Sequence, residues 1–303
     1  MKSKKAKALC MLFIFMLLGS SCGKKQTAQA VNEMDFSLDG IKDVTISYDD
    51  ENVSFFAGES DHLIIREYMS KDKKSYHAKV SQKKDSIKVS EGGKPFFKGS
   101  FTRYVEVYLP DSYSESLTVT TTDGNIDMAD LELDMKSIRV DCTSGTFKVK
   151  KAAAEDIYFS STSGNLELGS LAGTQIRIET TQGEVRCEEA EGNVTYTSTS
   201  GNAEFLSARG AGTYKANNSG KLSVSYEEVT GDLSFFNKND DVEVLLPSEL
   251  SFAFEAVTKN GSINTNFQEK ISADGDSITG TVGSNPTVTV KAETKNGNIE
   301  VSR

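Results

Sequence analysis

The chain has 303 residues and is acidic, with 34 Lys and Arg against 44 Asp and Glu and a net charge of −10. It therefore lacks the basic surface on which nucleic-acid binding depends, and no nucleic acid is expected among its partners. Ser, Thr, Val, Gly and Asn are plentiful, whereas only four Pro and no Trp occur, a composition that favours an all-β protein.

The first 21 residues have the features of a secretory signal peptide. Four lysines precede the apolar run from Ala8 to Leu18, which has 11 residues and is too short for the roughly 20 that a membrane-spanning helix needs. Small residues at 19–21 then precede Cys22, an arrangement similar to a loose form of the lipobox of bacterial lipoproteins. We expect cleavage before Cys22 and lipidation of its thiol, with ordinary cleavage near Ala28 or Ala30 as the alternative.

The rest of the chain divides into three parts. We expect a flexible tether over residues 22–33, an irregular N-terminal β region or cap over 34–110, and a repetitive β-solenoid over 111–303. Loss of residues 1–21 removes four lysines and no acidic residue, which makes the net charge −14. Because anionic lipid head groups repel such a charge, membrane attachment is expected to depend on acyl chains at Cys22.

Residues 34–110 contain a strand and turn pattern twice, weakly. Turns at Glu51 and Asp85 are flanked by alternating apolar residues: Val44, Ile46, Val53, Phe55, Ala78, Val80, Ile87 and Val89. An aromatic segment follows, with Phe96, Phe97, Phe101 and the run 104–109. We expect this segment to cap the end of the solenoid, because an open strand edge invites aggregation.

From residue 111 on, turns built of small residues recur at intervals of 17 to 21 residues. The turn positions are Gly124, Gly145, Gly164, Gly183, Gly201, Gly220, Asp240, Gly261 and Gly297, with Gly280 as a degenerate member. Gly tolerates the positive φ of tight turns, and so to a lesser degree do Asn and Asp. A fixed period of this length is typical of stacked repeats.

Apolar residues alternate on both sides of each turn, as Ile157, Phe159, Leu166 and Leu168 do around Gly164. This pattern predicts a strand with one buried face before the turn and another after it. Near Gly220, the residues Tyr214 and Ala216 are one position out of phase, which suggests a bulge.

A column of small residues three positions before the turn favours a parallel solenoid over the alternative, a meander of antiparallel hairpins. The column contains Thr121, Cys142, Ser161, Thr180, Ser198, Asn237, Thr258 and Thr294. Stacking places such residues about 4.8 Å apart, so that their hydroxyls can hydrogen-bond along the stack. We therefore predict an all-β fold, a parallel β-solenoid (β-helix) with coils of about 19 residues. Cys142 and Cys187 are then about 10 Å apart along the axis, beyond disulfide reach, and are predicted to be buried free thiols.

Three segments resemble the bacterial "putative adhesin" family, exported β-solenoid proteins of unknown function related to the GIN domain of auto-transporter adhesin heads. They are 162–168 (TSGNLEL), 199–205 (TSGNAEF) and 290–301 (VKAETKNGNIEV), within a likeness that extends over about residues 40–303. The resemblance implies a location at the cell surface or envelope, and some relatives look like accessory proteins of envelope-stress systems. Because the shared motifs are structural turns, they indicate the fold rather than an activity.

The chain has few groups of the kinds that catalysis uses. His62 and His77 are its only histidines, and motifs of metalloproteases, serine hydrolases and dithiol enzymes are missing. Paired carboxylates lie near turns and are interpreted as solvated corners: Asp49-Asp50, Glu188-Glu189, Glu227-Glu228 and Asp240-Asp241. We expect no catalytic residue, no metal and no cofactor.

The asparagines that follow the turns are the strongest binding feature of the sequence. They are Asn125, Asn165, Asn202 and Asn298, and stacked amides could form a ladder that contacts sugar hydroxyls. Stabilisation of the turns explains them without any ligand, and we favour this structural interpretation.

Three functions remain open at this point. The first is a surface-anchored, non-catalytic lipoprotein that presents a rigid solenoid for adhesion or for contact with the envelope or a glycan. The second is an accessory protein of an envelope stress response, and the third is a carbohydrate-active enzyme with two facing carboxylates. The expected partners are the membrane, through the N-terminal lipid, and a glycan, a host protein or an envelope protein. The expected location is outside the cytoplasm, lipid-anchored to the cell membrane or the outer membrane.

Overall fold

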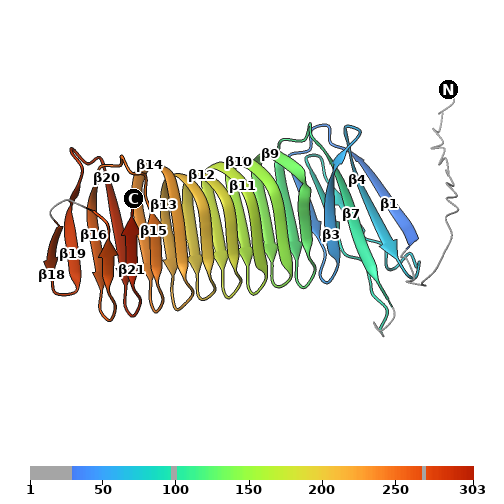
Figure 1. The fold of residues 1–303 in the computed structure, drawn as a ribbon. Helices are drawn as coiled ribbons and strands as arrows, with labels where there is room; N and C mark the ends of the chain where they lie inside the picture. The colour runs from blue at the N-terminus through green and yellow to red at the C-terminus, as the bar shows by residue number, and fades with distance from the viewer. Residues whose placement is uncertain (1–28, 97–100, 268–270) are drawn as a thin grey trace, which may run out of the picture.

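The computed structural model describes residues 29–96, 101–267 and 271–303, and within these ranges all regular elements are β-strands (Figure 1). No helix in these ranges has the length and apolarity to cross a bilayer. Cys22, most of the expected tether and Phe97 lie outside the described residues.

The strands wind into a long rod of stacked coils (Figure 1). In the middle of the rod each coil is one long strand that follows a tight turn, runs along one side, bends, and returns along the other side. These strands are β9 (Ile126–Cys142), β10 (Thr146–Ser161), β11 (Asn165–Thr180), β12 (Val185–Ser198), β13 (Ala203–Ala216) and β14 (Leu222–Asn237). Each pairs in parallel with the next, so the predicted parallel solenoid is confirmed and the antiparallel meander is wrong for this part.

The alternation of the sequence places apolar side chains between the two sides of each coil. Phe147 pairs in register with Leu166, and Leu166 with Val185, so that like positions form continuous interior columns. Phe147 and Phe159, from the two sides of one coil, meet edge to face with ring centroids 4.9 Å apart. Cys142 and Cys187 are free, buried thiols, as predicted.

We call the residues that follow the tight turns the front sheet and those that precede them the back sheet. The front sheet contains the first halves of β9–β14 together with β1, β4, β7, β3, β15, β21 and β17. The back sheet contains the second halves of β9–β14 together with β5, β6, β2, β8, β20, β16, β19 and β18.

At the N-terminal end the coils are not stacked in chain order. The first coil consists of β2 (Asp43–Ser47) and β3 (Asn52–Gly58). It lies between the coil of β6 (Ser86–Ser90) and β7 (Arg103–Pro110) and the coil of β8 (Ser116–Thr121) and β9. Beyond it, β1 (Gln29–Ser37) pairs antiparallel with β4 (His62–Met69), β4 with β7, and β5 (Lys79–Gln82) with β6.

Three expectations for the N-terminal third need correction. The run 104–109 belongs to β7, which lies inside the front sheet between β3 and β4, and Phe96 is 93% exposed, so this segment does not cap the rod. The turn at Asp85 joins β5 and β6 as an antiparallel hairpin and not as the two sides of a coil, and Val80 on β5 is 44% exposed. Residues 29–33, expected in the tether, form the start of β1, because β4 supplies a strand edge for them.

The C-terminal end has the same kind of insertion. The last coil, β20 (Val288–Thr294) and β21 (Ile299–Ser302), lies between the coil of β14 and β15 (Val242–Leu245) and the coil of β16 (Phe252–Thr258) and β17 (Ile263–Thr265). Gly280 lies in β19 (Ser277–Val282), which pairs antiparallel with β16 and with β18 (Ile271–Asp274). The interpretation of Gly280 as a turn is therefore wrong.

The predicted turn glycines stack directly upon one another. A Cβ atom on Gly164 would lie 2.1 Å from the carbonyl oxygen of Gly145, and one on Gly183 would lie 1.9 Å from that of Gly164. The same close approach joins Gly297 to Asp240 and Gly261 to Gly297, at 2.0 Å each. These positions require glycine because adjacent turns are in backbone contact.

The bulge expected near Gly220 is in the turn and not at Tyr214 or Ala216. Tyr214 pairs in register with Tyr196 and Phe235, and Ala216 pairs with Ser198 and Asn237. The extra residue therefore falls between Ala216 and Gly220. Irregular pairing of β13 with β14 occurs earlier in the chain, between Phe205 and Gly212.

We expect Gly164→Ala to lower the free energy of unfolding by about 1–3 kcal/mol, because the added methyl group overlaps the Gly145 carbonyl. Urea unfolding followed by circular dichroism measures the change. The control is Gly231→Ala, where the nearest atom to a new Cβ is the Ala211 side chain at 3.1 Å. Equal stability of the two variants would contradict the close stacking of the turns.

Candidate functional site

The outward side of the front sheet carries a continuous row of polar residues, one from each coil. In the central coils the row occupies the third position after the turn, and the pairing of the strands places its members side by side. From β9 to β17 it consists of Asp127, Lys148, Glu167, Arg186, Glu204, Ser223, Glu243, Glu300 and Asn264. We call it the front row.

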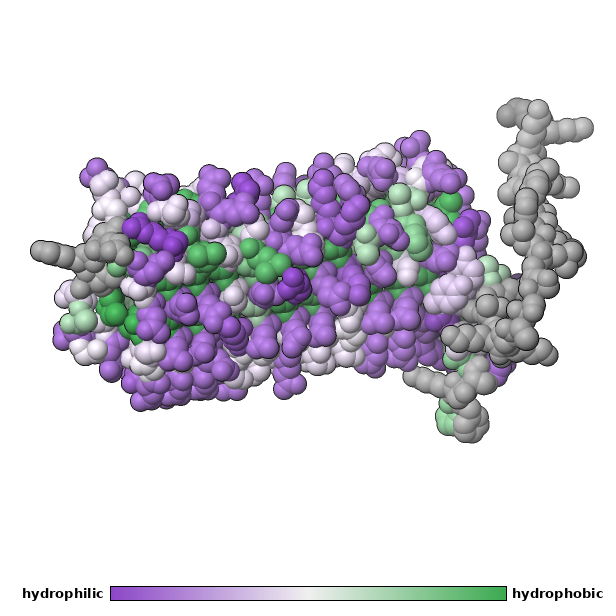
Figure 2. All heavy atoms as spheres, viewed as in Figure 1, coloured by the Kyte–Doolittle hydropathy of each residue, from purple (hydrophilic) through white to green (hydrophobic). Residues whose placement is uncertain are grey.

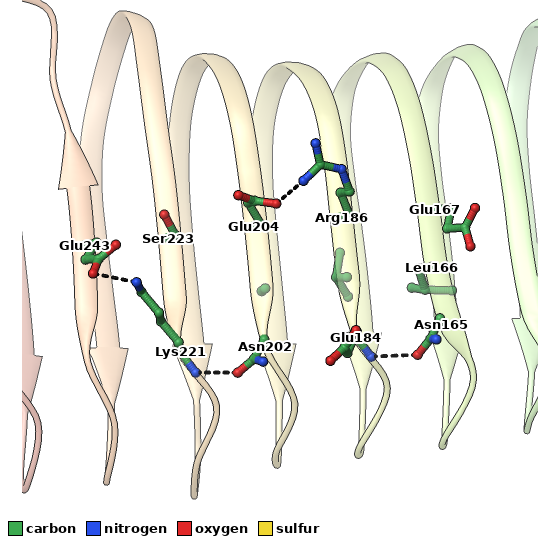
Figure 3. A pocket seen from close by; sticks show the side chains of 12 residues that line it. Asn165, Leu166, Glu167, Glu184, Arg186, Asn202, Glu204, Lys221, Ser223 and Glu243 are labelled. Atoms are coloured by element: carbon green, nitrogen blue, oxygen red, sulfur yellow. Dashed lines mark hydrogen bonds and ion pairs between the residues drawn. The ribbon is translucent and has the colours of Figure 1, made fainter.

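Ion pairs between coils neutralise much of the front row. Lys148 Nζ lies 2.7 Å from a carboxylate oxygen of Glu167, Arg186 pairs with Glu204, and Lys221 Nζ lies 2.6 Å from Glu243. Figure 3 shows the last two pairs side by side. Exposed pairs of this kind contribute little to stability, so their main consequence is that opposite charges lie next to each other along the row.

A shallow hollow of about 580 Å³ follows the front row over five coils (Figure 3). Its lining includes Glu167, Arg186, Glu204, Lys221 and Glu243. A second hollow of about 380 Å³ lies on the other side of the row and shares Glu167 and Arg186 with the first. The two hollows form an elongated groove along the rod with polar and apolar residues in its lining, a shape that fits an extended chain better than a small molecule.

Two exposed leucines interrupt this polar surface. Leu206 is 40% exposed on β13, and Leu245 is 49% exposed on β15. Figure 2 shows that hydrophilic side chains cover most of the face in view, with apolar side chains visible between them. The face can therefore offer charged, hydrogen-bonding and apolar contacts to one elongated ligand.

The predicted asparagine ladder exists, and its amide oxygens bond to the neighbouring coils. Asn125 Oδ1 accepts the backbone N–H of Thr146 at 2.7 Å, and Asn202 Oδ1 accepts that of Lys221 at 2.9 Å. Asn165 and Asn298 accept the N–H groups of Glu184 and Ser262 at 3.2 and 3.0 Å. Asn165 and Asn202 also line the groove, so the ladder forms the edge of the groove on the side of the turns.

The small residues before the turns mainly close their own turns. The hydroxyls of Thr121, Ser161 and Thr294 donate to the carbonyl oxygens of Gly124, Gly164 and Gly297 at 3.0, 2.8 and 2.7 Å. The expected bonding along the stack occurs between Thr294 and Thr258, whose hydroxyl oxygens are 2.8 Å apart. The buried hydroxyls of Thr180, Tyr196 and Ser198 have no hydrogen-bond partner in the described part of the chain.

The histidines do not converge on a common site. His62 Nδ1 lies 2.5 Å from Asp35, and His77 Nε2 lies 2.7 Å from Asp72, both at the protein surface. Among the residues that the structure describes, no group of three or more His, Cys, Asp or Glu is placed to hold a metal ion.

A buried ionic cluster at the turn of the first coil escaped the sequence reasoning. Arg103, whose side chain is fully buried, donates to Glu51 at 2.9 Å and to Glu91 at 2.6 Å. Lys94 contacts the same two carboxylates at 3.4 and 2.6 Å. The cluster ties the long insertion between β4 and β7 to the first coil. Its members are up to 52 residues apart, and no local motif connects them.

The two carboxyl groups of this cluster have opposite pKa shifts. Burial, together with a hydrogen bond to Glu91, raises the pKa of Glu51 to about 7, against the attraction of Arg103. Burial alone would raise the pKa of Glu91 as well, but hydrogen bonds from Glu51 and Lys94 lower it below the ordinary value. Glu51 is thus the first of the two carboxyl groups to take up a proton as the pH falls.

Stacked coils with two flat sheets and one turn edge define the class of the parallel β-solenoids. The chain belongs to the Toastrack DUF4097 family, whose model matches residues 41–302. No curated protein matches the sequence.

The chain is also similar to several solved structures. A "putative lipid binding protein" from Parabacteroides distasonis is 10% identical over 89% of this chain and 96% of that chain, with a TM-score of 0.47. A "putative adhesin" from Bacteroides fragilis is 12% identical over 92% and 98% of the two chains, with a TM-score of 0.31. Another "putative adhesin", from Parabacteroides merdae, is 12% identical over 89% and 95%, with a TM-score of 0.35.

We expect Asn125→Ala to lower the free energy of unfolding by about 0.5–1.5 kcal/mol, because the backbone N–H of Thr146 loses its acceptor. Asn125→Asp keeps an acceptor oxygen and should lose less. Chemical unfolding of the two variants measures the difference. A stability equal to that of the unmodified protein in both would show that the ladder is not needed for the stack.

Glu51 predicts a pH dependence of stability. Because its pKa is raised from 4.5 to about 7 on folding, the folded state holds a proton that the unfolded state releases. The stabilisation is complete below pH 4.5 and is lost as the pH rises to about 7. Relative to Glu51→Gln, the unmodified protein should lose up to about 1.4 kcal/mol per pH unit in this window. Parallel pH profiles of the unfolding free energy would contradict this assignment.

Proposed function

We propose that the protein is an exported lipoprotein that presents its front sheet as a non-catalytic contact surface for adhesion or for binding to a glycan or protein of the envelope or of a host. The front row carries this proposal. It holds one polar group per coil at a spacing of about 4.8 Å on a backbone fixed by strand pairing, and ion pairs join opposite charges of neighbouring coils.

The shape of the groove favours an elongated ligand. It is open and crosses five coils, so a ligand that lies along it meets many weak contacts at once. Such contacts become strong together when the binding surface is rigid, because little entropy is lost on binding. The backbone pairing of β9–β14 and the asparagine ladder supply this rigidity.

The non-catalytic part of the proposal is supported by the ion pairs of three carboxylates that line the groove. Glu167, Glu204 and Glu243 are each engaged by a cation of a neighbouring coil. A pair of glycosidase carboxylates instead needs one protonated acid with a raised pKa beside one ionised group.

Export and anchoring belong to the same proposal. The signal-like sequence and Cys22 suggest that a lipid holds the mature chain at its N-terminus. Strand β1 starts at Gln29, so about seven residues, which span at most about 25 Å, would separate the lipid from the rod. The rod would therefore stay close to the membrane at its N-terminal end.

Binding of the mature chain to glycan arrays and to immobilised extracellular-matrix proteins tests the proposal. We expect the triple variant Glu167→Ala, Arg186→Ala, Glu204→Ala to reduce binding at least about tenfold, the scale of one or two lost contact residues at an interface. The matched control is Glu255→Ala, Lys291→Ala, Glu293→Ala on the back sheet, which also removes two acids and one base, including the ion pair of Lys291 with Glu255.

Equal binding by the two triple variants would overturn the assignment of the front sheet. Cleavage of a bound glycan by the unmodified protein would overturn its non-catalytic part.

A further inference from the structure

The charge of the protein is strongly segregated, with one basic segment in an acidic chain. Residues 71–88 contain seven lysines and two acidic residues, which gives this segment a net charge of +5. The rest of the chain after residue 21 then has a net charge of −19. Repulsion from anionic lipid, expected from the mean charge, therefore does not apply to this segment.

The seven lysines lie on the surface at the N-terminal end of the rod. They are Lys71, Lys73, Lys74, Lys79, Lys83, Lys84 and Lys88, and all of them are exposed. They come from the loop after β4 and from the hairpin of β5 and β6, where β5 is the last strand of the back sheet among the described residues. We call this surface the basic end.

Five of the seven lysines of the basic end have no counter-charge within the described ranges. Lys74, Lys79, Lys83, Lys84 and Lys88 make no ion pair with any residue in the described ranges. The carboxylate of Asp72 is engaged by His77, 2.7 Å away, and Lys73 lies over the ring of Tyr76. On the adjoining end of the front sheet, the acids Glu33 and Asp35 are paired with Arg66 and His62.

Two apolar side chains are exposed in the same part of the molecule. Val80 on β5 is 44% exposed, and Phe96, two residues after Lys94 of the buried cluster, is 93% exposed. Lysines interspersed with exposed apolar groups are the combination that binds the surface of an anionic bilayer, where the cations meet phosphates and the apolar groups enter the interface.

The proposed lipid on Cys22 would bring the basic end to the membrane. Gln29, the first residue of β1, pairs with Met69, directly before the loop of Lys71, Lys73 and Lys74. Met69 in turn pairs with Arg103, whose guanidinium donates to the carbonyl of Tyr76 in that loop. A tether from Cys22 to Gln29 therefore ends beside the basic loop, within about 25 Å of any lipid on Cys22.

We propose that the basic end is a docking surface for anionic phospholipid head groups, which holds the N-terminal end of the rod on the membrane while the acidic remainder is repelled from it. This inference is independent of what the front sheet binds. It adds a second, electrostatic attachment to that of the acyl chains expected at Cys22.

Vesicle co-sedimentation of the chain from Gly23 to Arg303 tests the proposal, because this chain keeps every described residue and lacks Cys22. We expect binding to phosphatidylcholine vesicles that contain phosphatidylglycerol, little binding to pure phosphatidylcholine, and loss of binding at high salt. Each lysine near an anionic surface contributes about a fivefold change in affinity. Replacement of Lys71, Lys73, Lys74, Lys83 and Lys84 by Gln should therefore lower the affinity at least about tenfold.

The matched control replaces Lys136, Lys150, Lys151, Lys238 and Lys259 by Gln, five exposed lysines of the solenoid. It has the same net charge as the test variant and should change the affinity by about twofold or less. Phe96→Ser should weaken vesicle binding without changing its salt dependence, because it removes an apolar contact and no charge. Circular dichroism of each variant verifies that it is folded.

Absence of binding to the anionic vesicles at low salt would overturn the proposal, and so would equal losses in the two lysine variants. Equally tight binding to soluble polyphosphate would assign the basic end to a polyanion and not to a bilayer. The front-sheet triple variant should bind the vesicles as the unmodified chain does, which separates this result from the adhesion assay.

Discussion

The solenoid depends on the in-register parallel pairing of each coil with its neighbour. The pairing places equal positions of successive coils one strand spacing apart, about 4.8 Å. That spacing brings the turn of Gly164 into backbone contact with the turn of Gly145, aligns the asparagine amides with the next backbone N–H, and lets Lys148 reach Glu167. The same constraint thus produces the interior columns, the ladders at the turns and the ordered charges of the front sheet.

The central coils could be predicted from the sequence because there the neighbour in space is the next repeat in the chain. The period of the turn glycines and the alternation around them predict β9–β14, their buried faces and the free thiols of Cys142 and Cys187. A second column, Gly173, Gly192 and Gly210 at the bend, has the same period and could have been found in the same way. A Cβ atom on Gly192 would lie 1.7 Å from the carbonyl oxygen of Gly173.

The ends of the rod could not be predicted by the same reasoning, because there the order in space differs from the order in the chain. The periodicity gives Gly261 the place next to Asp240, whereas the structure places Gly297 between them. The antiparallel strands β1, β4, β5, β18 and β19 have no repeat to identify them. The net charge of the chain does not indicate the basic end, because the nineteen excess negative charges elsewhere outweigh the five excess positive charges of residues 71–88.

The position of β20 and β21 between two coils that precede them in the chain has a consequence for folding. A chain that ends after β19 contains β16 and β17, but it lacks the coil that joins them to β14 and β15. Until residues 288–303 pair, the strand edges of the two coils that they join remain open. A product truncated before Val288 would therefore carry open edges that proteases can recognise.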